Sequence, residues 1–419
     1  MSAVVDPAGL LAERAARHER MFWLDGGGSR PWSGRRSFLG FLDDDDVSLT
    51  YDAGCREVRR HQGHRADVVG DDIFDVLGDE IGRDQGDPDV SWVGYLGYAC
   101  RPDLPARPAG DVPDAVWMRV RAPLLVEHPP AVGHPGAPRD DAGDDPRSHE
   151  TPGWYSDAFD AVQAELRRGN SYEVNLTYRE RVPSPADPVS AYLRLRASNP
   201  APYAGYLQHR GVALLSSSPE RFATIDRHRR LETKPIKGTT PRGTTQVDDE
   251  AQAERLARDP KFRAENLMIV DLLRNDLSMV CEPGTVDVPA LMEVESYPSV
   301  HQLVSTVRGH LRDDVTTVAA LRALFPAGSM TGAPKLRTME IIDRVEATPR
   351  GVYAGAFGWV SGDGRADLGV VIRSLVARAD EGQWAYTLGT GGGITVRSDV
   401  HEEYAETRWK AARLRAVLG

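Results

Sequence analysis

The order of strand-like and helical runs is the feature that most restricts how this chain can fold. Short alternating runs of apolar and polar residues fill most of 21–126, with one helical run near 72–77. After residue 154, further strands occur in blocks separated by longer helical runs. This pattern predicts an α/β (α+β) fold in which helices cover large mixed sheets. The later helical runs are 157–168, 248–259, 261–277, 316–325, 334–345 and 400–418, and the later strands include 171–178, 352–360, 368–377 and 384–388.

The bulk composition is that of an ordinary globular protein. The chain has 419 residues, enough for two or three domains or for one large α/β unit, and 41% of them are hydrophobic. Its net charge of -11 argues against nucleic acid or an anionic membrane as a partner, because both require a basic face. The three cysteines form no C-x-x-C motif, and the sequence has no signal-type N-terminus and no apolar run of about 18 residues. These features predict a cytoplasmic protein that does not enter a membrane.

A Pro-, Gly- and Asp-rich stretch at 127–153 divides the chain. Its low apolar content predicts a flexible surface connection. We therefore expect an N-terminal region, 1–150, and a second region, 154–419, which carries the motifs described below.

The stretch 216–243 holds an acid and an amine between residues that restrict the backbone. Glu220 follows S-S-S-P, and Lys237 stands in P-I-K-G-T-T-P-R-G. The runs 212–216 and 229–236 predict two strands joined by a turn, which would bring Glu220 and Lys237 to the same end of a sheet. A carboxyl group beside an amine suits acid-assisted nucleophilic catalysis, and a surface salt bridge is the alternative. The proline and glycines around the lysine favour the catalytic interpretation.

These motifs resemble the signatures of the chorismate-utilising enzymes. S-S-S-P-E-R-F and P-I-K-G-T-T-P-R-G are similar to the aminodeoxychorismate synthase component I branch of that family, whereas anthranilate synthases usually have alanine at the position of Lys237. The resemblance implies two large sheets packed face to face, as in anthranilate synthase component I, with the site between them. It also implies that 1–150 adds strands to the same body and that 154–419 is the chorismate-binding region.

Two helical runs carry carboxylates on faces that require a partner. Glu265 in A-E-N-L-M shares a face with Ile269, so either a buried ion pair or a metal ion must compensate its charge. In the last helical run, Glu403, Glu406 and Lys410 form one stripe at spacings i, i+3 and i+7. Two helices that present carboxylates suit Mg²⁺, which takes few protein ligands and keeps several waters. The resemblance implies that Glu265 and Glu406 bind Mg²⁺, with Glu403 and Lys410 beside them.

Several motifs suit an anionic ligand. P-A-G-S-M-T-G-A-P-K predicts a helix start, with Thr331 near the N-cap and Pro334 in the first turn, where free N–H groups bind carboxylates. L-G-T-G-G-G-I follows a predicted strand and either forms a bulge or lets backbone amides approach a ligand. Arg373 lies within the strand-like V-V-I-R-S-L-V and needs a counter-ion, such as a substrate carboxylate. By resemblance, the substrate-binding residues are Thr239, Ser329, Tyr353, Arg373, Gly391, Gly392, Gly393 and Lys410.

The sequence departs from the family pattern at two places. The family usually has histidine directly before Leu-Val-Ser, where this chain has Gln302, with His301 one residue earlier. Because a shift of one residue turns an extended side chain to the other face, the histidine role is not assigned to His301. The Leu-Glu-Ser element of tryptophan-binding members is not evident around 23–28, so tryptophan binding stays open.

The resemblance implies that chorismate is aminated. Protonated Glu220 would donate to the departing C4 hydroxyl, neutral Lys237 would attack C2, and ammonia would then add at C4 to give 4-amino-4-deoxychorismate. Burial and the positive charges of Mg²⁺ and Arg373 are expected to lower the pKa of Lys237. The cysteines lie in G-C-R, A-C-R and V-C-E rather than in the G-x-C-x-G of a glutaminase. A separate glutamine amidotransferase subunit is therefore the expected source of ammonia.

Two other functions stay open beside this one. An anthranilate or 2-amino-2-deoxyisochorismate synthase component I is disfavoured by Lys237, since ammonia would attack C2 directly in such an enzyme. A catalytically silent ligand-binding regulator on the same fold is disfavoured because the acidic and basic positions of the site are filled. The motifs do not distinguish folate (p-aminobenzoate) from antibiotic biosynthesis, and they do not define an oligomeric state.

Overall fold

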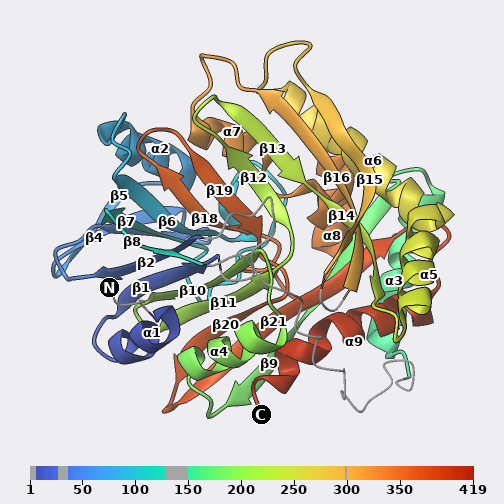
Figure 1. The fold of residues 1–419 in the computed structure, drawn as a ribbon, viewed down its shortest axis with the longest axis horizontal. Helices are drawn as coiled ribbons and strands as arrows, with labels where there is room; N and C mark the ends of the chain where they lie inside the picture. The colour runs from blue at the N-terminus through green and yellow to red at the C-terminus, as the bar shows by residue number, and fades with distance from the viewer. Residues whose placement is uncertain (1–5, 27–35, 129–149, 298–299) are drawn as a thin grey trace.

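Two large sheets form the body of the protein (Figure 1). The computed structural model describes residues 6–26, 36–128, 150–297 and 300–419. Within these ranges every pairing between neighbouring strands is antiparallel. The predicted α/β (α+β) fold with two large sheets is confirmed, and the sheets are antiparallel rather than mixed.

The strands of each sheet come from distant parts of the chain. The first sheet contains, in spatial order, β17 (Gly332–Ala333), β9 (Glu173–Ser184), β21 (Gln383–Ile394), β20 (Ser374–Asp380), β11 (Val212–Ser218), β10 (Tyr203–His209), β1 (Arg20–Asp25), β2 (Arg36–Leu42) and β8 (Leu124–Glu127). The second contains β14 (Ile236–Pro241), β16 (Val300–His310), β13 (Arg230–Lys234), β12 (Arg221–Ile225), β19 (Ala366–Val370), β18 (Ala356–Ser361), β6 (Val90–Leu96), β7 (Ala115–Arg121), β3 (Ser48–Asp52), β4 (Glu57–Gln62) and β5 (Arg65–Gly70), with β15 (Asp287–Ser296) on β16.

The N-terminal strands belong to both sheets. β1 pairs with β10 in the first sheet, and β6 pairs with β18 in the second. Strands that precede residue 129 are therefore hydrogen-bonded to strands that follow residue 150. Most of the predicted connection at 127–153 lies outside the described residues, and the division of the chain at that point stays a prediction.

Helices cover the sheets and the ends of the strands. Every helical run predicted above is a helix, whereas α1 and α4 were not anticipated. Several helices start where an aspartate side chain accepts a hydrogen bond from first-turn backbone N–H groups, as Asp72, Asp259 and Asp399 do. The helices are α1 (Pro7–Ala15), α2 (Ile73–Arg83), α3 (Gly153–Arg167), α4 (Pro188–Ser198), α5 (Gln246–Arg258), α6 (Pro260–Ser278), α7 (Thr317–Leu324), α8 (Lys335–Val345) and α9 (Val400–Ala416).

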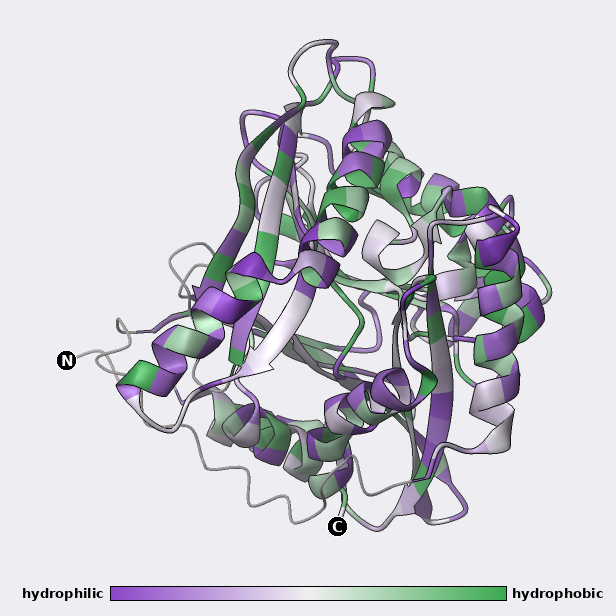
Figure 2. Cartoon of the chain, turned by 90° about the vertical axis from the view of Figure 1, so that its right-hand side faces the viewer, coloured by the Kyte–Doolittle hydropathy of each residue, from purple (hydrophilic) through white to green (hydrophobic). Residues whose placement is uncertain are grey.

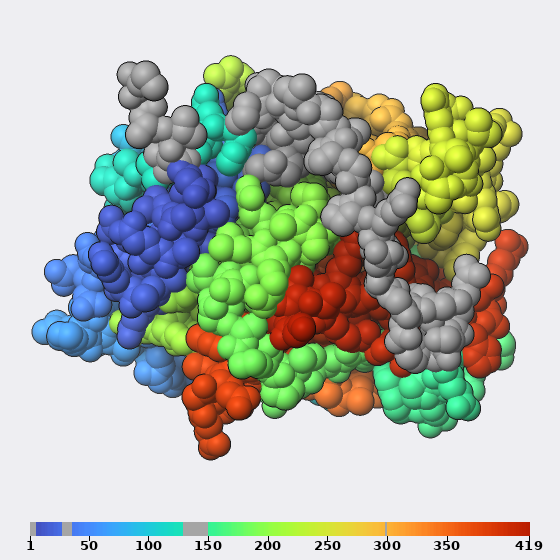
Figure 3. All heavy atoms as spheres, turned by 60° about the horizontal axis from the view of Figure 1, so that its bottom comes forward, coloured from blue at the N-terminus to red at the C-terminus, as the bar shows by residue number. Residues whose placement is uncertain are grey.

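The two sheets share a hydrophobic core. Phe22 and Leu214 of the first sheet pack in one cluster with Tyr95 and Met118 of the second. In Figure 2 the helices seen on this side mix hydrophilic and hydrophobic residues, as expected where one helix face packs and the other is solvated. On the face drawn in Figure 3, the red C-terminal part of the chain lies beside the green part, in agreement with the contact between α9 and α4. Burial of apolar surface between the sheets therefore holds distant segments in one body.

Two of the places where the chain crosses between the sheets lie next to each other, which the sequence did not predict. The expected pairing of 212–216 with 229–236 is wrong, because β11 belongs to the first sheet, whereas β12 and β13 form a hairpin in the second. The run 368–377 is likewise two strands, β19 and β20, in different sheets. Since β11 pairs with β20 and β12 pairs with β19, the two crossing segments run side by side.

The glycine run lies inside a strand rather than after one. Gly391, Gly392 and Gly393 are paired with β9 in continuous register. The facing part of β9, from Glu173 to Thr177, is buried at every position, so the expected half-buried alternation at 171–178 is wrong. Helices contribute to this burial, since α3 and α8 pack on the same strand.

The start of α8 also differs from the expectation. Its N-cap is Pro334, which makes no side-chain capping bond, so Thr331 lies before the cap. Thr331 instead donates its hydroxyl to the Gly328 carbonyl within a buried turn. The turn and β17 are thereby placed between the helix and β9.

Candidate active site

A cavity of about 130 Å³ opens where the crossing segments meet β14, β21, α6 and α9. All the candidate residues from the sequence line it, although they come from eight separate parts of the chain. They are Glu220, Lys237, Thr239, Glu265, Ser329, Tyr353, Arg373, Gly391, Gly392, Gly393, Glu403, Glu406 and Lys410.

Lys237 bridges the two sheets. It lies in β14 of the second sheet, and its Nζ donates a hydrogen bond to Oε1 of Glu173 in β9 of the first sheet. A Cβ atom at position 393 would overlap Glu173 Oε1, so any residue larger than glycine would force the Glu173 side chain, and with it the ion pair, to move. Glycine suits position 393 because side chains approach the backbone closely there, and not because the backbone angle is unusual.

The charge state of Lys237 differs from the expectation. Burial disfavours the ammonium form, but the carboxylates of Glu173, Glu265 and Glu220 outweigh this effect and raise the pKa of Lys237. The predicted lowering of its pKa is wrong for the ligand-free protein. Sequence reasoning missed Glu173 because S-Y-E-V-N looked like an alternating strand with its glutamate in solvent.

Glu220 is the buried acid of the site. It lies at the crossing between β11 and β12, and its side chain is 5% exposed. Burial raises its pKa to about 7, against the opposing effects of a hydrogen bond from Ser329 and the charge of Lys237. Near neutral pH a large fraction of Glu220 is therefore protonated and able to donate a proton.

Arg373 occupies the second crossing and is not part of a strand, contrary to the expectation. Its φ of 51° places it in the left-handed region, between β19 and β20. The guanidinium lies over the ring of Trp409, and among the described residues it makes no hydrogen bond or ion pair. Burial, assisted by the charge of Arg413, lowers its pKa to about 10. Arg373 thus presents an uncompensated cation to the cavity.

The crossings fix Glu220 and Arg373 relative to each other. The Val370 N–H donates to the Glu220 carbonyl at 3.0 Å, and the Ser217 N–H donates to the Arg373 carbonyl at 3.2 Å. Backbone hydrogen bonds between adjacent segments therefore set the separation of an acid and a cation.

Carboxylates of α6 and α9 also line the cavity. Glu403 is paired with Lys261 at 2.8 Å, and Glu406 with Lys410 at 2.8 Å. Glu265 has no such partner: its buried Oε1 accepts no hydrogen bond from the described residues. Burial, the largest influence, raises the pKa of Glu265 to about 7. A buried carboxylate oxygen without a partner requires either a proton or a cation.

These residues fit a hard divalent cation. Oxygen ligands from one or two carboxylates, completed by water and substrate, are the usual environment of Mg²⁺. In the described ranges no group of three or more His, Cys, Asp or Glu side chains is arranged around one metal position. A site based on Glu265 and Glu406 would therefore use few protein ligands, as Mg²⁺ does.

Gln302, rather than His301, belongs to the cavity. Gln302 lines it, and its buried Oε1 accepts no hydrogen bond from the described residues. His301 points to the other side of β16, where its ring contacts Asp249 at 2.9 Å and Ser296 at 2.8 Å. The position of His301 outside the cavity agrees with the decision not to assign the histidine role to it, because neighbouring residues of a strand face opposite sides.

Comparison with known proteins identifies the family. Residues 56–416 match the model of the chorismate binding enzymes. The chain belongs to this family. An aminodeoxychorismate synthase of Streptomyces pristinaespiralis is 41% identical over 98% of this chain and 62% of its own length. That of Streptomyces griseus is 49% identical over 78% of this chain and 50% of its own length.

The fold of this family member agrees with a solved structure. The anthranilate synthase component I of Streptococcus pneumoniae superposes with a TM-score of 0.75 at 24% identity, covering 99% of this chain and 98% of that one. At this identity the likeness concerns the fold alone. The chain spans between half and two thirds of the length of the two Streptomyces relatives.

No helix within the described residues is both long and apolar enough to cross a membrane. The three cysteines are free thiols, Cys55 at the surface and the other two buried.

Proposed function

We propose that this chain is the chorismate-aminating part of an aminodeoxychorismate synthase and that it forms 4-amino-4-deoxychorismate. The observation that carries the proposal is the placement of Lys237, Glu220 and Arg373 around one cavity. The names of the Streptomyces relatives support the same activity. An amine, an acid that is partly protonated near neutral pH and an unpaired cation are the groups that this reaction requires.

Arg373 and backbone N–H groups would hold the substrate. Chorismate carries two carboxylates, and a guanidinium without a protein partner suits one of them. Tyr353 and the glycine run would provide a flat surface for the ring. Arg373 lies at a sheet crossing, the glycine run lies on β21 and Tyr353 lies in the turn before β18, so the ring would be oriented by groups on or beside the two sheets.

Glu220 would act as the general acid. Its proton passes to the C4 hydroxyl, which leaves as water, and Ser329 holds the carboxyl group in position. A Glu220 pKa of about 7 keeps the acid form available at neutral pH.

Lys237 would act as the nucleophile once Glu173 has accepted its proton. The Lys237–Glu173 ion pair favours the ammonium form in the free protein. The substrate carboxylates would be bound near Arg373 and would not accept the Lys237 proton. The shortest route for this proton is along the existing hydrogen bond from Lys237 to Glu173. The amine then attacks C2 as the protonated C4 hydroxyl leaves as water. In the next step ammonia adds at C4, and the lysine leaves C2 as the ring double bonds return to their original positions.

Glu265 and Glu406 would hold Mg²⁺, with Glu403 and Lys410 beside them. When bound, the ion supplies positive charge for a substrate carboxylate. Without the ion, the carboxylates of Glu265, Glu403 and Glu406 would repel a dianionic substrate. Lys261 and Lys410 would not offset this repulsion, because each is already paired with a glutamate.

A separate glutamine amidotransferase would supply the ammonia, since no cysteine of this chain lies in a glutaminase motif. We place the complex in the cytoplasm, where free thiols such as these persist.

The decisive experiment follows the products of chorismate, Mg²⁺ and ammonium by chromatography. The purified chain should form 4-amino-4-deoxychorismate with ammonium but not with glutamine. Anthranilate or 2-amino-2-deoxyisochorismate as the main product would support the alternative enzyme, and tight chorismate binding without turnover would support a silent regulator. Robust glutamine-dependent turnover by the chain alone would contradict the partner proposal.

A further inference from the structure

A second cavity, of about 470 Å³, lies on the inner face of the first sheet. It is larger than the candidate active site, and none of the chemistry proposed above uses it. Its floor is formed by alternate residues of β9, β21 and β20, and its roof by the segments 109–112 and 348–353. A cavity of this size is typical of small-molecule sites.

The strand registers order the floor from one end to the other. At the inner end Gly389 faces Arg179, in the middle Thr387 lies between Val376 and Arg181, and at the outer end Ala385 faces Arg378. Gly389 and Tyr353 line both cavities, so Tyr353 forms part of the wall between them. The second cavity therefore begins where the candidate active site ends.

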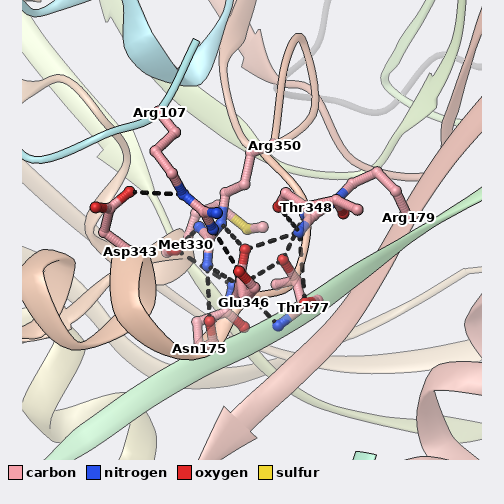
Figure 4. Close-up of polar contacts among 9 residues, drawn as sticks. All are labelled: Arg107, Asn175, Thr177, Arg179, Met330, Asp343, Glu346, Thr348 and Arg350. Carbon is pink, nitrogen blue, oxygen red and sulfur yellow. Dashed lines mark hydrogen bonds and ion pairs between the residues drawn. The ribbon is translucent and has the colours of Figure 1, made fainter. Parts of the chain in front are cut away.

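Two buried arginines at the inner end share one carboxylate (Figure 4). Arg179 and Arg350 each contact Glu346, at 2.8 Å and 2.7 Å, and the side chains of all three are at most 6% exposed. The group therefore carries one net positive charge away from solvent. Burial lowers the pKa of Arg179, Glu346 raises it, and Arg350 lowers it further. A nearby anion would compensate this charge.

Arg179 also retains hydrogen-bonding capacity. Its Nη1 carries two N–H groups, and among the described residues it donates only to the Thr177 hydroxyl, at 2.7 Å. Arg350, in contrast, is engaged with the carbonyls of Met330 and Asn175 as well as with Glu346. Arg179 is thus the residue of this group that can bind a ligand.

The remaining walls are mainly apolar. Val112, Val352, Val371 and Val376 face the space between Arg179 and the outer end. Farther out, Arg181 is paired with Asp111 at 2.6 Å. At the outer end Asp380 lies 3.7 Å from Arg378, with no other carboxylate of the described residues within ion-pair distance of it, and both side chains are about half exposed. A ligand that matches these walls has an apolar body and one negative charge.

We propose that the second cavity binds a small organic monocarboxylate, with its carboxylate on Arg179 and its apolar body against the valines. Such a ligand would lie against Tyr353 on the side opposite chorismate. Its binding is independent of the proposed reaction, and it is measured without turnover.

Calorimetry with phenylacetate and phenylacetamide tests the proposal. The amide has the shape of the acid but lacks its charge, so it should bind at least about tenfold more weakly if the arginine group is the anchor. Phenylacetate should also bind when chorismate is saturating and ammonium is absent. Displacement by chorismate would place the acid in the active site and overturn the proposal. Equal affinity for the amide, or no saturable binding below about 10 mM, would overturn it as well.

Variants at two positions locate the site. Val376→Trp fills the middle of the cavity and should abolish phenylacetate binding, whereas Val376→Ala should retain it. Arg179→Lys keeps the charge but loses the Nη1 donor, and it should weaken binding by about tenfold or more. Thermal melts of all three variants identify any that fail to fold. Unchanged binding by a folded Val376→Trp protein would overturn the proposal.

Discussion

Glu173 changes the expected chemistry of Lys237. A lysine with a lowered pKa would be ready to react in the free enzyme, whereas this lysine is held as an ammonium by a carboxylate from the other sheet. In the proposed reaction, this ammonium would have to lose a proton before the lysine could attack. Its reactivity would therefore depend on proton transfer to Glu173 rather than on burial alone.

Replacement of Lys237 tests the nucleophile. Lys237→Ala should reduce formation of 4-amino-4-deoxychorismate by about 10³-fold, and Lys237→Arg should be equally inactive because a guanidinium is not a nucleophile. Chromatography of the ammonium-dependent products gives the measurement, and it also detects any C2-aminated product of the alanine variant. Amination at C4 by Lys237→Ala at the wild-type rate would leave the lysine as an electrostatic neighbour only.

Glu220 should make stability depend on pH with a predictable sign. Its folded pKa of about 7 lies above the usual value of 4.5, so the folded state binds the proton more tightly. Between pH 4.5 and 7 the unfolded chain loses this proton first, and the free energy of unfolding falls as pH rises.

Glu220→Gln removes this dependence. Its stability relative to the wild type should increase by up to about 3 kcal/mol between pH 4.5 and pH 7.5, while its turnover falls by about 10²–10⁴-fold. Urea denaturation of both proteins at the two pH values measures the difference. A constant difference would mean that Glu220 is ionised at neutral pH and is not the acid.

Gly393 in β21 allows the Lys237–Glu173 ion pair to form beside the strand. Strand β21 lies against the Lys237–Glu173 ion pair, and a Cβ atom at position 393 of this strand would overlap the Glu173 carboxylate. Gly393→Ala should displace the pair and reduce turnover by about 10²-fold, whereas Gly82→Ala in α2, where an added Cβ meets nothing within 4 Å, should have no effect. Steady-state rates of the two variants, compared with their melting temperatures, separate a local effect from misfolding. Normal turnover of Gly393→Ala would contradict this role.

Helices α6 and α9 should act together in metal binding. Glu265→Gln and Glu406→Gln should each abolish turnover with the fold intact, and EDTA should do so reversibly in the wild type. Magnesium titration followed by calorimetry provides a readout apart from activity. Wild-type Mg²⁺ affinity in either variant would exclude that residue as a ligand.

Sequence patterns predicted the elements better than their connections. The helices were found because apolar residues recur at helical spacing, and the candidate residues were found because S-S-S-P-E-R-F and P-I-K-G-T-T-P-R-G are distinctive. The crossings were missed because the residue pattern of 212–225 is the same whether a strand continues or changes sheets. Glu173 was missed for a related reason: alternation indicates a strand but not whether both of its faces are covered.

The buried Glu346 group connects distant elements across the whole molecule. Arg350 joins the C-terminal end of α8, the turn at Met330 and strand β9, so its loss leaves Arg179 as the remaining arginine partner of Glu346 and removes a donor from two buried carbonyls. Arg350→Met should lower the free energy of unfolding by about 3–5 kcal/mol. Arg344→Met, in the last turn of α8 and half exposed, serves as the control and should cost less than about 1 kcal/mol. Equal losses in urea denaturation would show that burial of the arginine is unimportant.

The side-by-side crossings have a consequence for engineering. Glu220 and Arg373 lie where the chain leaves one sheet for the other. Neither sheet alone therefore contains the complete site, and the site cannot be grafted onto another scaffold with one sheet. A split of the gene into two fragments, or a circular permutation, would preserve the catalytic centre only if β11–β12 and β19–β20 each remain uncut. New termini are better placed in the hairpin between β4 and β5, which lies at the far edge of the second sheet from β14.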